Sequence, residues 1–161
     1  MITEVKGWKE VRNAMQSVLT RKHVFTVFKI KDIDPVSLEV VEGQNMKGTG
    51  SCTAVPTEEE VYEAWDKFEK LFHKEGEATK EPFYAVYDFG YYCPGNNYRS
   101  MLILFSYVPA CQKGKVKMVY STNVQAIKES MNIPYLIQAD SLDAVDYNKI
   151  KESVSRIQIT I

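Results

Sequence analysis

The sequence predicts an α/β domain in which a central mixed β-sheet packs against helices. Stretches with apolar residues at three- and four-residue steps occur before, between and after stretches rich in β-branched and aromatic residues. The 161 residues are enough to enclose one hydrophobic core. The chain has no evident repeat or change of composition that would mark a second domain. Residues 1–161 are therefore expected to form one layered domain.

The first part of the chain predicts a helix and a β-hairpin. Residues 8–20 are expected to form an amphipathic helix, because apolar residues recur at helical spacing. These residues are Trp8, Val11, Met15 and Val18. Residues 24–31 and 37–42 are rich in β-branched and apolar side chains and flank a turn, which predicts two paired strands. The stretch 43–57 is rich in glycine and polar residues and predicts a flexible loop.

A second helix and a second hairpin are expected in the middle of the chain. Thr57 and Glu60 form a capping-box pattern at the start of a helix over residues 58–73. The apolar stripe of this helix consists of Val61, Trp65, Phe68 and Phe72. Strands over residues 83–91 and 100–108 flank a turn, and their length predicts a hairpin that projects beyond the sheet.

The stretch 115–131 is expected to change from strand to helix. Lys115 and Lys117 alternate as at the end of a strand, and Ser121 and Thr122 are residue types that cap helices. The residues at helical spacing behind them are Ala126, Ile127 and Met131. Alternate residues of a strand project to the same side. Both lysines are therefore predicted to lie on one surface with the positive amino-terminal end of the helix.

The end of the chain predicts a strand, a helix and a tail. Residues 135–139 are expected to form the strand, and residues 143–156 the helix. Its apolar positions, spaced for burial, are Val145, Ile150, Val154 and Ile157. The tail 157–161 alternates like a strand and is expected either to extend a sheet edge or to fray.

Charge and composition limit the classes of function. The formal net charge is -1 at pH 7, which argues against a general affinity for nucleic acid. Between Arg99 and Lys128 every charged side chain is basic, which favours an acidic partner. No apolar run approaches the ~20 residues that cross a bilayer, and no signal-peptide pattern is present. A cytoplasmic protein is therefore expected.

The cysteine and histidine residues predict no catalytic or metal site. They are Cys52, Cys93, Cys111, His23 and His73. The cysteines are odd in number and lack paired spacing, so free thiols are expected rather than disulfides or zinc ligands. A cysteine nucleophile with a histidine base is the alternative, but no spacing brings these residues together on one element. We therefore expect no enzyme and no cofactor.

Several ordered blocks resemble the actin-depolymerising factor/cofilin family. They are FYAVYDF at 83–89, LILFSYVP at 102–109, KVKMVY at 115–120, IQAD at 137–140 and SVSR at 153–156. The resemblance implies the ADF-homology, gelsolin-like fold, in which two pairs of helices sandwich a central mixed sheet. It also implies a monomeric actin-binding protein of the actin cytoskeleton.

The resemblance implies one face that binds both monomeric and filamentous actin. Its positions here are Val5, Lys115, Lys117, Met118, Thr122, Asn123, Val124, Gln125 and Lys128. Val124 stands where relatives often carry Lys, and Gln125 where they often carry Asp. We expect an exposed Val124 to lower the association rate by removing a charge. The alternative for Lys115 and Lys117 is that they are ordinary solvated lysines.

A second surface, used only on filaments, is implied for Arg99, Met101, Glu152 and Arg156. Met101 and Ser153 replace basic residues of the family pattern, and each lost ion pair is worth only ~0–1 kcal/mol. The expected activity is cofilin-type filament depolymerisation or severing, with weakened side binding and a preference for monomers. The alternative within the fold is a coactosin-like or glia-maturation-factor-like protein that binds filaments or the actin-related branching complex.

Two regulatory sites are also implied by the resemblance. Thr3 occupies the region where many relatives carry a regulatory Ser, so it is a candidate phosphorylation site. A phosphate would add about −1.5 to −2 charges and repel an acidic partner. The basic surface is also a candidate site for phosphoinositide headgroups, which would compete with actin.

Overall fold

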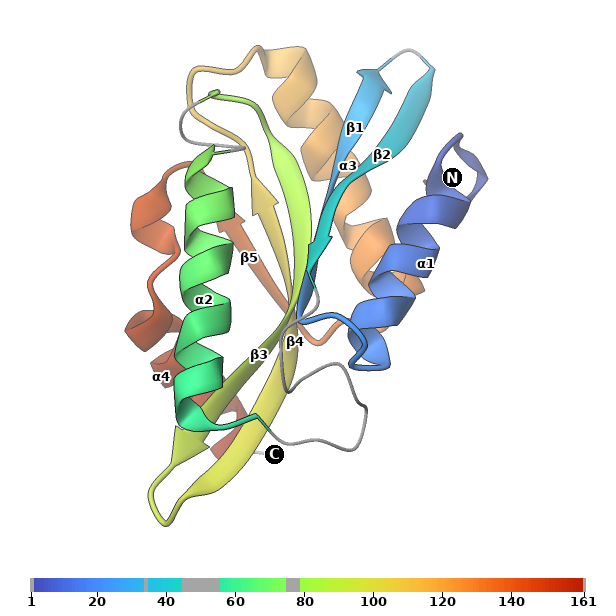
Figure 1. Ribbon diagram of the computed structural model, residues 1–161. Helices are drawn as coiled ribbons and strands as arrows, with labels where there is room; N and C mark the ends of the chain where they lie inside the picture. The colour runs from blue at the N-terminus through green and yellow to red at the C-terminus, as the bar shows by residue number, and fades with distance from the viewer. Residues whose placement is uncertain (1, 34, 45–55, 75–78, 161) are drawn as a thin grey trace.

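The computed structural model describes residues 2–33, 35–44, 56–74 and 79–160 (Figure 1). Residues 45–55, which make up most of the predicted loop over 43–57, lie outside this described part.

Within the described residues, five strands form one mixed sheet in the order β2-β1-β3-β4-β5. They are β1 (Phe25–Ile33), β2 (Val36–Gln44), β3 (Phe83–Cys93), β4 (Asn97–Tyr107) and β5 (Tyr135–Ala139). Strands β1 to β4 pair in antiparallel fashion, whereas β5 runs parallel to β4. The predicted mixed sheet and its two hairpins are confirmed.

The described helices cover both faces of the sheet. They are α1 (Trp8–Leu19), α2 (Glu58–Phe72), α3 (Gly114–Ser130) and α4 (Tyr147–Thr160), with short 3-10 turns η1 (Ile2–Glu4) and η3 (Leu142–Ala144). Helices α1 and α3 lie on one face, and α2 and α4 on the other (Figure 1). This confirms the predicted sandwich of a sheet between two pairs of helices.

Each face of the sheet has its own hydrophobic core. The core beneath α2 and α4 is aromatic, and its centre is Trp65, whose ring centroid lies 5.2 Å from that of Tyr87 and 5.7 Å from that of Tyr147. The opposite core contains the α1 stripe predicted from the sequence, consisting of Trp8, Val11, Met15 and Val18. The capping box of Thr57 and Glu60 at the start of α2 is also confirmed.

The β3–β4 hairpin extends beyond the rest of the sheet. The two strands pair from Phe83–Tyr107 to Cys93–Asn97. Strand β1 pairs only with residues 84–87 of β3, and β5 pairs only with residues 103–107 of β4. The far part of the hairpin therefore projects from the sheet, as predicted, and is visible at the bottom of Figure 1.

The prediction of a strand end over residues 115–120 is wrong. Helix α3 begins at Gly114, so Lys115 and Lys117 both lie in its first turns. Its buried side contains Tyr120, Val124 and Ile127, whose steps of four and three residues fit a helix. Ser121 does not cap the helix but lies within it, where its hydroxyl donates to the Lys117 carbonyl oxygen at 2.7 Å.

The strand-like tail predicted over 157–161 is also wrong for its described residues. Helix α4 continues to Thr160. Ile157 lies three residues after Val154 and packs against the aromatic core. Burial of this helical stripe therefore decides the conformation, although the apolar residues also alternate.

Candidate functional site

One side of α3 faces solvent along the whole helix. Its exposed residues at three- and four-residue steps are Lys115, Met118, Thr122, Gln125 and Glu129, which we call the α3 stripe. Residues at this spacing lie one above the other on a helix. Met118 is 62% exposed, and Tyr62 is the other large hydrophobic side chain exposed among the described residues. The stripe therefore combines an apolar side chain with polar and charged neighbours.

The two lysines that open α3 do not share a side. Residues two apart on a helix point about 200° from each other, since each residue turns the helix by about 100°. Lys115 is exposed on the α3 stripe, whereas Lys117 is half-buried on its flank. The Lys117 ammonium group donates to the carbonyl oxygen of Ala110 at 2.7 Å. The prediction that both lysines project to one side is wrong, because it assumed a strand.

Val124 lies in the core rather than on the surface. Its side chain is 3% exposed and belongs to the core cluster between α1, α3 and the sheet. The predicted exposure of Val124 is therefore wrong, since its position follows the buried stripe of α3. Its neighbours differ: Gln125 is exposed, and Asn123 is half-buried and donates to the Val119 carbonyl oxygen at 2.8 Å.

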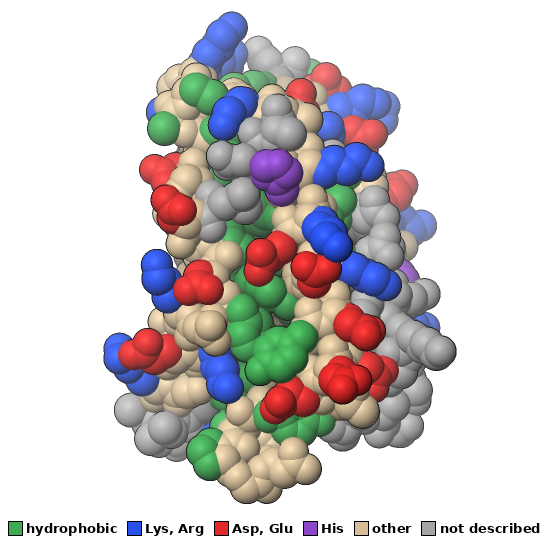
Figure 2. Space-filling model, turned by 60° about the vertical axis from the view of Figure 1, so that its left-hand side comes forward, with side chains coloured by type: hydrophobic (Ala, Val, Ile, Leu, Met, Phe, Trp, Pro, Cys, Tyr) green, Lys and Arg blue, Asp and Glu red, His purple; other side chains and the backbone are tan. Residues whose placement is uncertain are grey.

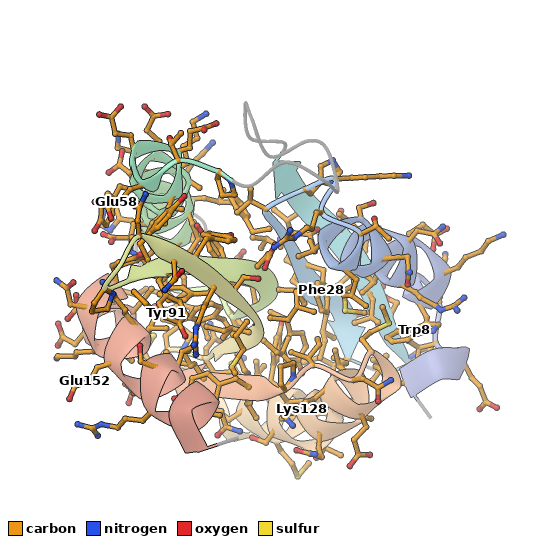
Figure 3. The ribbon with its side chains drawn as sticks, turned by 90° about the horizontal axis from the view of Figure 1, so that it is seen from below. Trp8, Phe28, Glu58, Tyr91, Lys128 and Glu152 are labelled. Atoms are coloured by element: carbon orange, nitrogen blue, oxygen red, sulfur yellow. The ribbon has the colours of Figure 1, made fainter. Side chains whose placement is uncertain are left out.

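The amino-terminal segment is held beside α3. The side chain of Ile2 is 3% exposed, and the half-buried Val5 packs against the same core as α3. The Leu38 amide donates to the Lys6 carbonyl oxygen at 2.8 Å. Figure 3 shows the start of the chain and α3 at the same side of the molecule. Val5 therefore packs against the core that also contains the buried side of α3. The side chain of Thr3 lies outside the described atoms.

Glycine is required where this segment passes over β2. Gly7 has a φ of +90°, a conformation that other residues rarely adopt. A Cβ atom there would lie 1.9 Å from the carbonyl oxygen of Leu38. The close approach allows Lys6 and Ser37 to form a parallel bridge. Gly7 therefore fixes the path of the chain from η1 into α1.

Two buried tyrosines fasten α3 to the sheet. The Tyr84 hydroxyl donates to the Tyr120 carbonyl oxygen, and their ring centroids lie 4.7 Å apart. The Tyr120 hydroxyl accepts from the Ile30 amide at 3.0 Å and donates to the Pro82 carbonyl oxygen at 3.2 Å. Burial raises the pKa of both tyrosines well above the usual value. Sequence reasoning missed this arrangement, which places α3 relative to β1 and β3.

The predicted filament surface is only partly exposed. Arg99 is exposed on β4, and Glu152 and Arg156 are exposed on α4, where they form an ion pair. Arg99 pairs across the hairpin with Tyr91, which interacts with Ser155 of α4. These three charged residues therefore belong to neighbouring elements. Met101 is 8% exposed, so its side chain offers a partner little surface.

The opposite face of the molecule has a different charge. Figure 2 shows Asp and Glu side chains gathered around an apolar patch on this face. The exposed acids of α2 are Glu58, Glu59, Glu63, Asp66 and Glu69. An acidic partner would be repelled here, whereas the first turns of α3 carry basic side chains and no acid.

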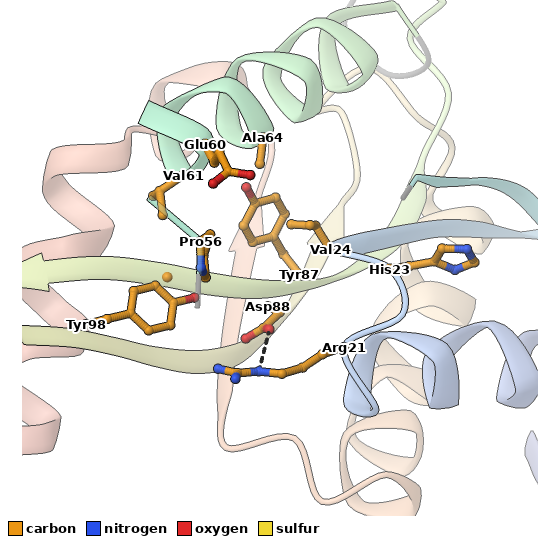
Figure 4. A pocket seen from close by; sticks show the side chains of 11 residues that line it. Arg21, His23, Val24, Pro56, Glu60, Val61, Ala64, Tyr87, Asp88 and Tyr98 are labelled. Atoms are coloured by element: carbon orange, nitrogen blue, oxygen red, sulfur yellow. Dashed lines mark ion pairs between the residues drawn. The ribbon is translucent and has the colours of Figure 1, made fainter. Parts of the chain in front are cut away.

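A small cavity lies between the end of α1, the start of α2 and the projecting hairpin (Figure 4). Its walls include Arg21, His23, Glu60, Asp88 and Tyr98. The cavity is small, with a volume of only about 30 Å³. Among the described residues, no group of three His, Cys, Asp or Glu is placed to hold a metal ion. No described helix is long and apolar enough to span a membrane.

The fold and the exposed helix define a class of α/β proteins with a sandwiched mixed sheet. A model of the family described as cofilin/tropomyosin-type actin-binding protein matches residues 4–155. The chain therefore belongs to the cofilin/ADF family, and the resemblance seen in the sequence is confirmed.

The sequence of this chain matches curated relatives over part of their length. The chain is 32% identical over 83 residues to cofilin of Gibberella zeae, covering 50% of this chain and 54% of the relative. It is 33% identical over 75 residues to cofilin of Saccharomyces cerevisiae, covering 45% of this chain and 52% of the relative. The aligned part thus spans about half the length of these relatives.

The fold of this chain matches that of several solved structures over nearly its whole length. The ADF-like UNC-60A protein of Caenorhabditis elegans has a TM-score of 0.67 at 20% identity, over 90% of both chains. Cofilin of Streptomyces griseoflavus has a TM-score of 0.63 at 20% identity, over 91% of this chain and 92% of that one. Human coactosin-like protein has a TM-score of 0.65 at 12% identity, over 92% of this chain and 95% of that one. These similarities establish the shared fold.

Proposed function

We propose that this protein binds monomeric and filamentous actin and promotes filament disassembly in the manner of a cofilin. The observation that supports this most is the α3 stripe, which exposes Met118 between Lys115 and Thr122 on a helix of a cofilin/ADF-family protein. The site of action would be the actin cytoskeleton of the cytoplasm. The role is one of binding, without catalysis.

The stripe has the chemistry of a helix that docks into a shallow apolar groove. Burial of the exposed part of Met118 against such a groove would contribute roughly 1–2 kcal/mol. The surrounding polar residues would fix the orientation of the helix, as in other helix-in-groove complexes. Met118 is therefore the proposed anchor, with Thr122 and Gln125 beside it.

The start of α3 adds attraction for carboxylate groups. Its N-cap residue, Lys113, makes no side-chain hydrogen bond to the helix, so no capping side chain satisfies the first amides. The partial positive charge of these amides and the ammonium group of Lys115 would both favour an acidic surface. We assign flanking contacts to Val5, Lys117, Asn123 and Lys128. Val124 is left out because it is buried.

The filament surface is proposed to be weaker than the α3 surface. Arg99, Glu152 and Arg156 are the exposed members of the set predicted for it, and the last two form an ion pair with each other. A partner must compete with that pair, although an exposed pair of this kind is worth only ~0.3–0.5 kcal/mol. We infer that the protein favours actin monomers over filament sides.

Two modes of regulation follow from the same surface. Phosphoinositide headgroups would bind the basic side chains at the start of α3 and compete with actin. A phosphate on Thr3 would place negative charge on the amino-terminal segment, which lies beside α3. Both modes would weaken actin binding by the same electrostatic means.

A second candidate is a coactosin-like protein that binds filaments alone. The structural similarity to human coactosin-like protein, with its TM-score of 0.65, is as strong as that to the cofilins. We favour the cofilin-type proposal, because the exposed start of α3 would give monomers a surface as well.

Filament pelleting and nucleotide exchange on monomers, measured side by side, test the proposal. We expect the wild-type protein to bind in both assays and Lys115→Ala to weaken monomer binding by about fivefold. The matched control is Lys67→Ala, an exposed lysine of α2, which should behave like the wild type. Pelleting with no effect on monomers would favour the coactosin-like alternative. Failure of the wild type in both assays would exclude actin binding.

A further inference from the structure

Arg21 ends α1 in an unusual backbone conformation. Its φ is +64°, and its amide donates to the Val18 carbonyl oxygen at 3.1 Å. Glycine is the usual residue at such a helix end, because a Cβ atom is disfavoured there. An arginine in this position suggests that its side chain makes contacts that glycine could not make.

The side chain of Arg21 reaches the base of the projecting hairpin. Its Nε lies 3.7 Å from Oδ2 of Asp88, and its Nη2 donates to the Ser100 hydroxyl oxygen at 3.3 Å. Its guanidinium carbon lies 5.9 Å from the ring centroid of Tyr98. Figure 4 shows the guanidinium group alongside the two hairpin strands. One side chain therefore contacts β3 once and β4 twice.

These contacts lie at and beyond the end of the hairpin's pairing with its neighbours in the sheet, where the Asp88 amide still donates to the Val24 carbonyl oxygen at 2.8 Å. The pairing of β1 with β3 ends at Tyr87, one residue before Asp88. The pairing of β5 with β4 begins only at Ile103, three residues after Ser100. The hairpin beyond these points has no further strand beside it among the described residues. Side-chain contacts from other elements must therefore hold its direction.

Arg21 contacts one face of the hairpin, and Arg99 projects from the other face. Gly90 pairs with Ser100 and Tyr91 with Arg99, so Ser100 and Arg99 point to opposite sides of β4. Tyr91 is buried in the core beneath α2 and α4 and interacts with Ser155 of α4, which places its cross-strand neighbour Arg99 on the α4 side. Arg21 comes from α1 on the other side of the sheet.

We propose that Arg21 is a positioning residue that braces the hairpin and thereby holds Arg99 on the side of the sheet that α4 covers. The inference rests on the proposed filament surface and adds a residue outside it. Arg21 acts through the hairpin and leaves the α3 stripe unchanged. Its loss therefore weakens filament binding and spares monomer binding.

The test uses Arg21→Gly, which removes the side chain and suits the backbone conformation. Hydrogen exchange should become about tenfold faster for hairpin amides between residues 88 and 101. Filament affinity should fall about fivefold, whereas monomer affinity should change less than about twofold. Arg21→Lys keeps the charge but not the forked geometry. It should therefore show smaller changes in hairpin exchange and in filament affinity than Arg21→Gly. Lys22→Ala, at an exposed neighbour, is the matched control.

A double-mutant cycle with Arg99→Ala separates positioning from direct contact. If Arg21 acts through Arg99, then Arg21→Gly should cause little further loss of filament affinity in the Arg99→Ala protein. An equal loss in both backgrounds would mean that Arg21 touches the filament itself, and unchanged hairpin exchange would refute the brace. If the wild type binds monomers but does not pellet, the filament part of the proposed function fails, and with it the effect of Arg21 on filament binding. The exchange rates still report whether Arg21 holds the hairpin.

Discussion

The hydroxyl group of Tyr84 donates a hydrogen bond to the backbone carbonyl oxygen of Tyr120 at 2.6 Å. Both residues are buried, one in the centre of β3 and the other near the middle of α3. The bond thus joins the helix that carries the proposed actin-binding stripe to a central strand of the sheet. This buried bond therefore helps to fix the position of the exposed α3 stripe.

Tyr84→Phe should destabilise the protein by about 1–2 kcal/mol, because it leaves a helix carbonyl without its buried donor. Urea unfolding followed by circular dichroism measures the change. The control is Tyr62→Phe, because Tyr62 is 48% exposed. That control should alter the free energy of unfolding by less than about 0.5 kcal/mol. Equal stabilities of the two variants would contradict the role of the Tyr84 bond.

Adjacent residues of α3 should differ sharply in their effect on stability. Val124→Ala should cost about 1–2 kcal/mol, since it removes two buried carbon atoms from a side chain that is 3% exposed. Gln125→Ala should change stability by less than about 0.5 kcal/mol but weaken monomer binding, because Gln125 lies on the α3 stripe. Thermal denaturation and a monomer titration give both values. A neutral Val124→Ala would argue against the burial of this position.

The two glycines that begin helices should respond in opposite ways to alanine. Gly7→Ala should destabilise the fold by about 1–3 kcal/mol, because it combines a positive φ with a clash against the Leu38 carbonyl oxygen. Gly114→Ala should be neutral or stabilising by up to about 1 kcal/mol, since a Cβ there meets nothing within 4 Å. Denaturant midpoints provide the comparison. A Gly7→Ala protein as stable as the wild type would refute the fixed path of the amino-terminal segment.

Stability should fall in alkaline solution because of buried tyrosines. Burial, with a smaller contribution from Asp88, raises the pKa of Tyr98 to about 12. Burial also raises the pKa of Tyr84 and Tyr120. An unfolded tyrosine ionises near pH 10, so above about pH 10 the unfolded chain loses protons that the folded chain retains. These tyrosines leave the free energy of unfolding unchanged below about pH 10, and they reduce it as the pH rises from there towards 12.

Guanidinium midpoints between pH 8 and pH 11.5 measure this effect. Tyr98→Phe should make the alkaline decline shallower, because it removes one of the raised pKa values. An identical decline in both proteins would show that Tyr98 ionises equally easily in the folded and unfolded states.

Elements with one dominant local signal could be predicted from the sequence. The capping box of Thr57 and Glu60 and the stripe from Val61 to Phe72 specify α2 without reference to the rest of the chain. The lengths of the β3 and β4 segments likewise predicted a projecting hairpin. In these cases the local preference and the tertiary environment favour the same structure.

The start of α3 could not be predicted because its local signals conflict. Lys115 and Lys117 alternate around Val116, which is typical of a strand. The buried side of the helix contains Tyr120, Val124 and Ile127, and the half-buried Val116 extends it towards the start. Tertiary burial selects the helical spacing. In this helix the two lysines lie on different sides, and Val124 lies in the core.

The contacts of Arg21 depend on residues far away in the sequence. Arg21 and Ser100 are separated by 79 positions, and nothing in the local pattern around either residue indicates that they meet. The same is true of Tyr84 and Tyr120, which are 36 positions apart. The family resemblance predicted the residues of the proposed actin-binding face, whereas the contacts that hold α3 and the hairpin in place emerged only from the structure.

The most direct test is the affinity of Met118→Ser for fluorescently labelled ADP-actin monomers. Met118 is 62% exposed, so the substitution should leave the free energy of unfolding within about 0.5 kcal/mol of the wild-type value. We predict an affinity at least about tenfold weaker than that of the wild type, a change of about 1.4 kcal/mol. Tyr62→Ser, at the exposed aromatic residue of α2, should bind as the wild type does. Equal monomer affinities of Met118→Ser and the wild type would contradict the assignment of the α3 stripe as the actin-binding surface.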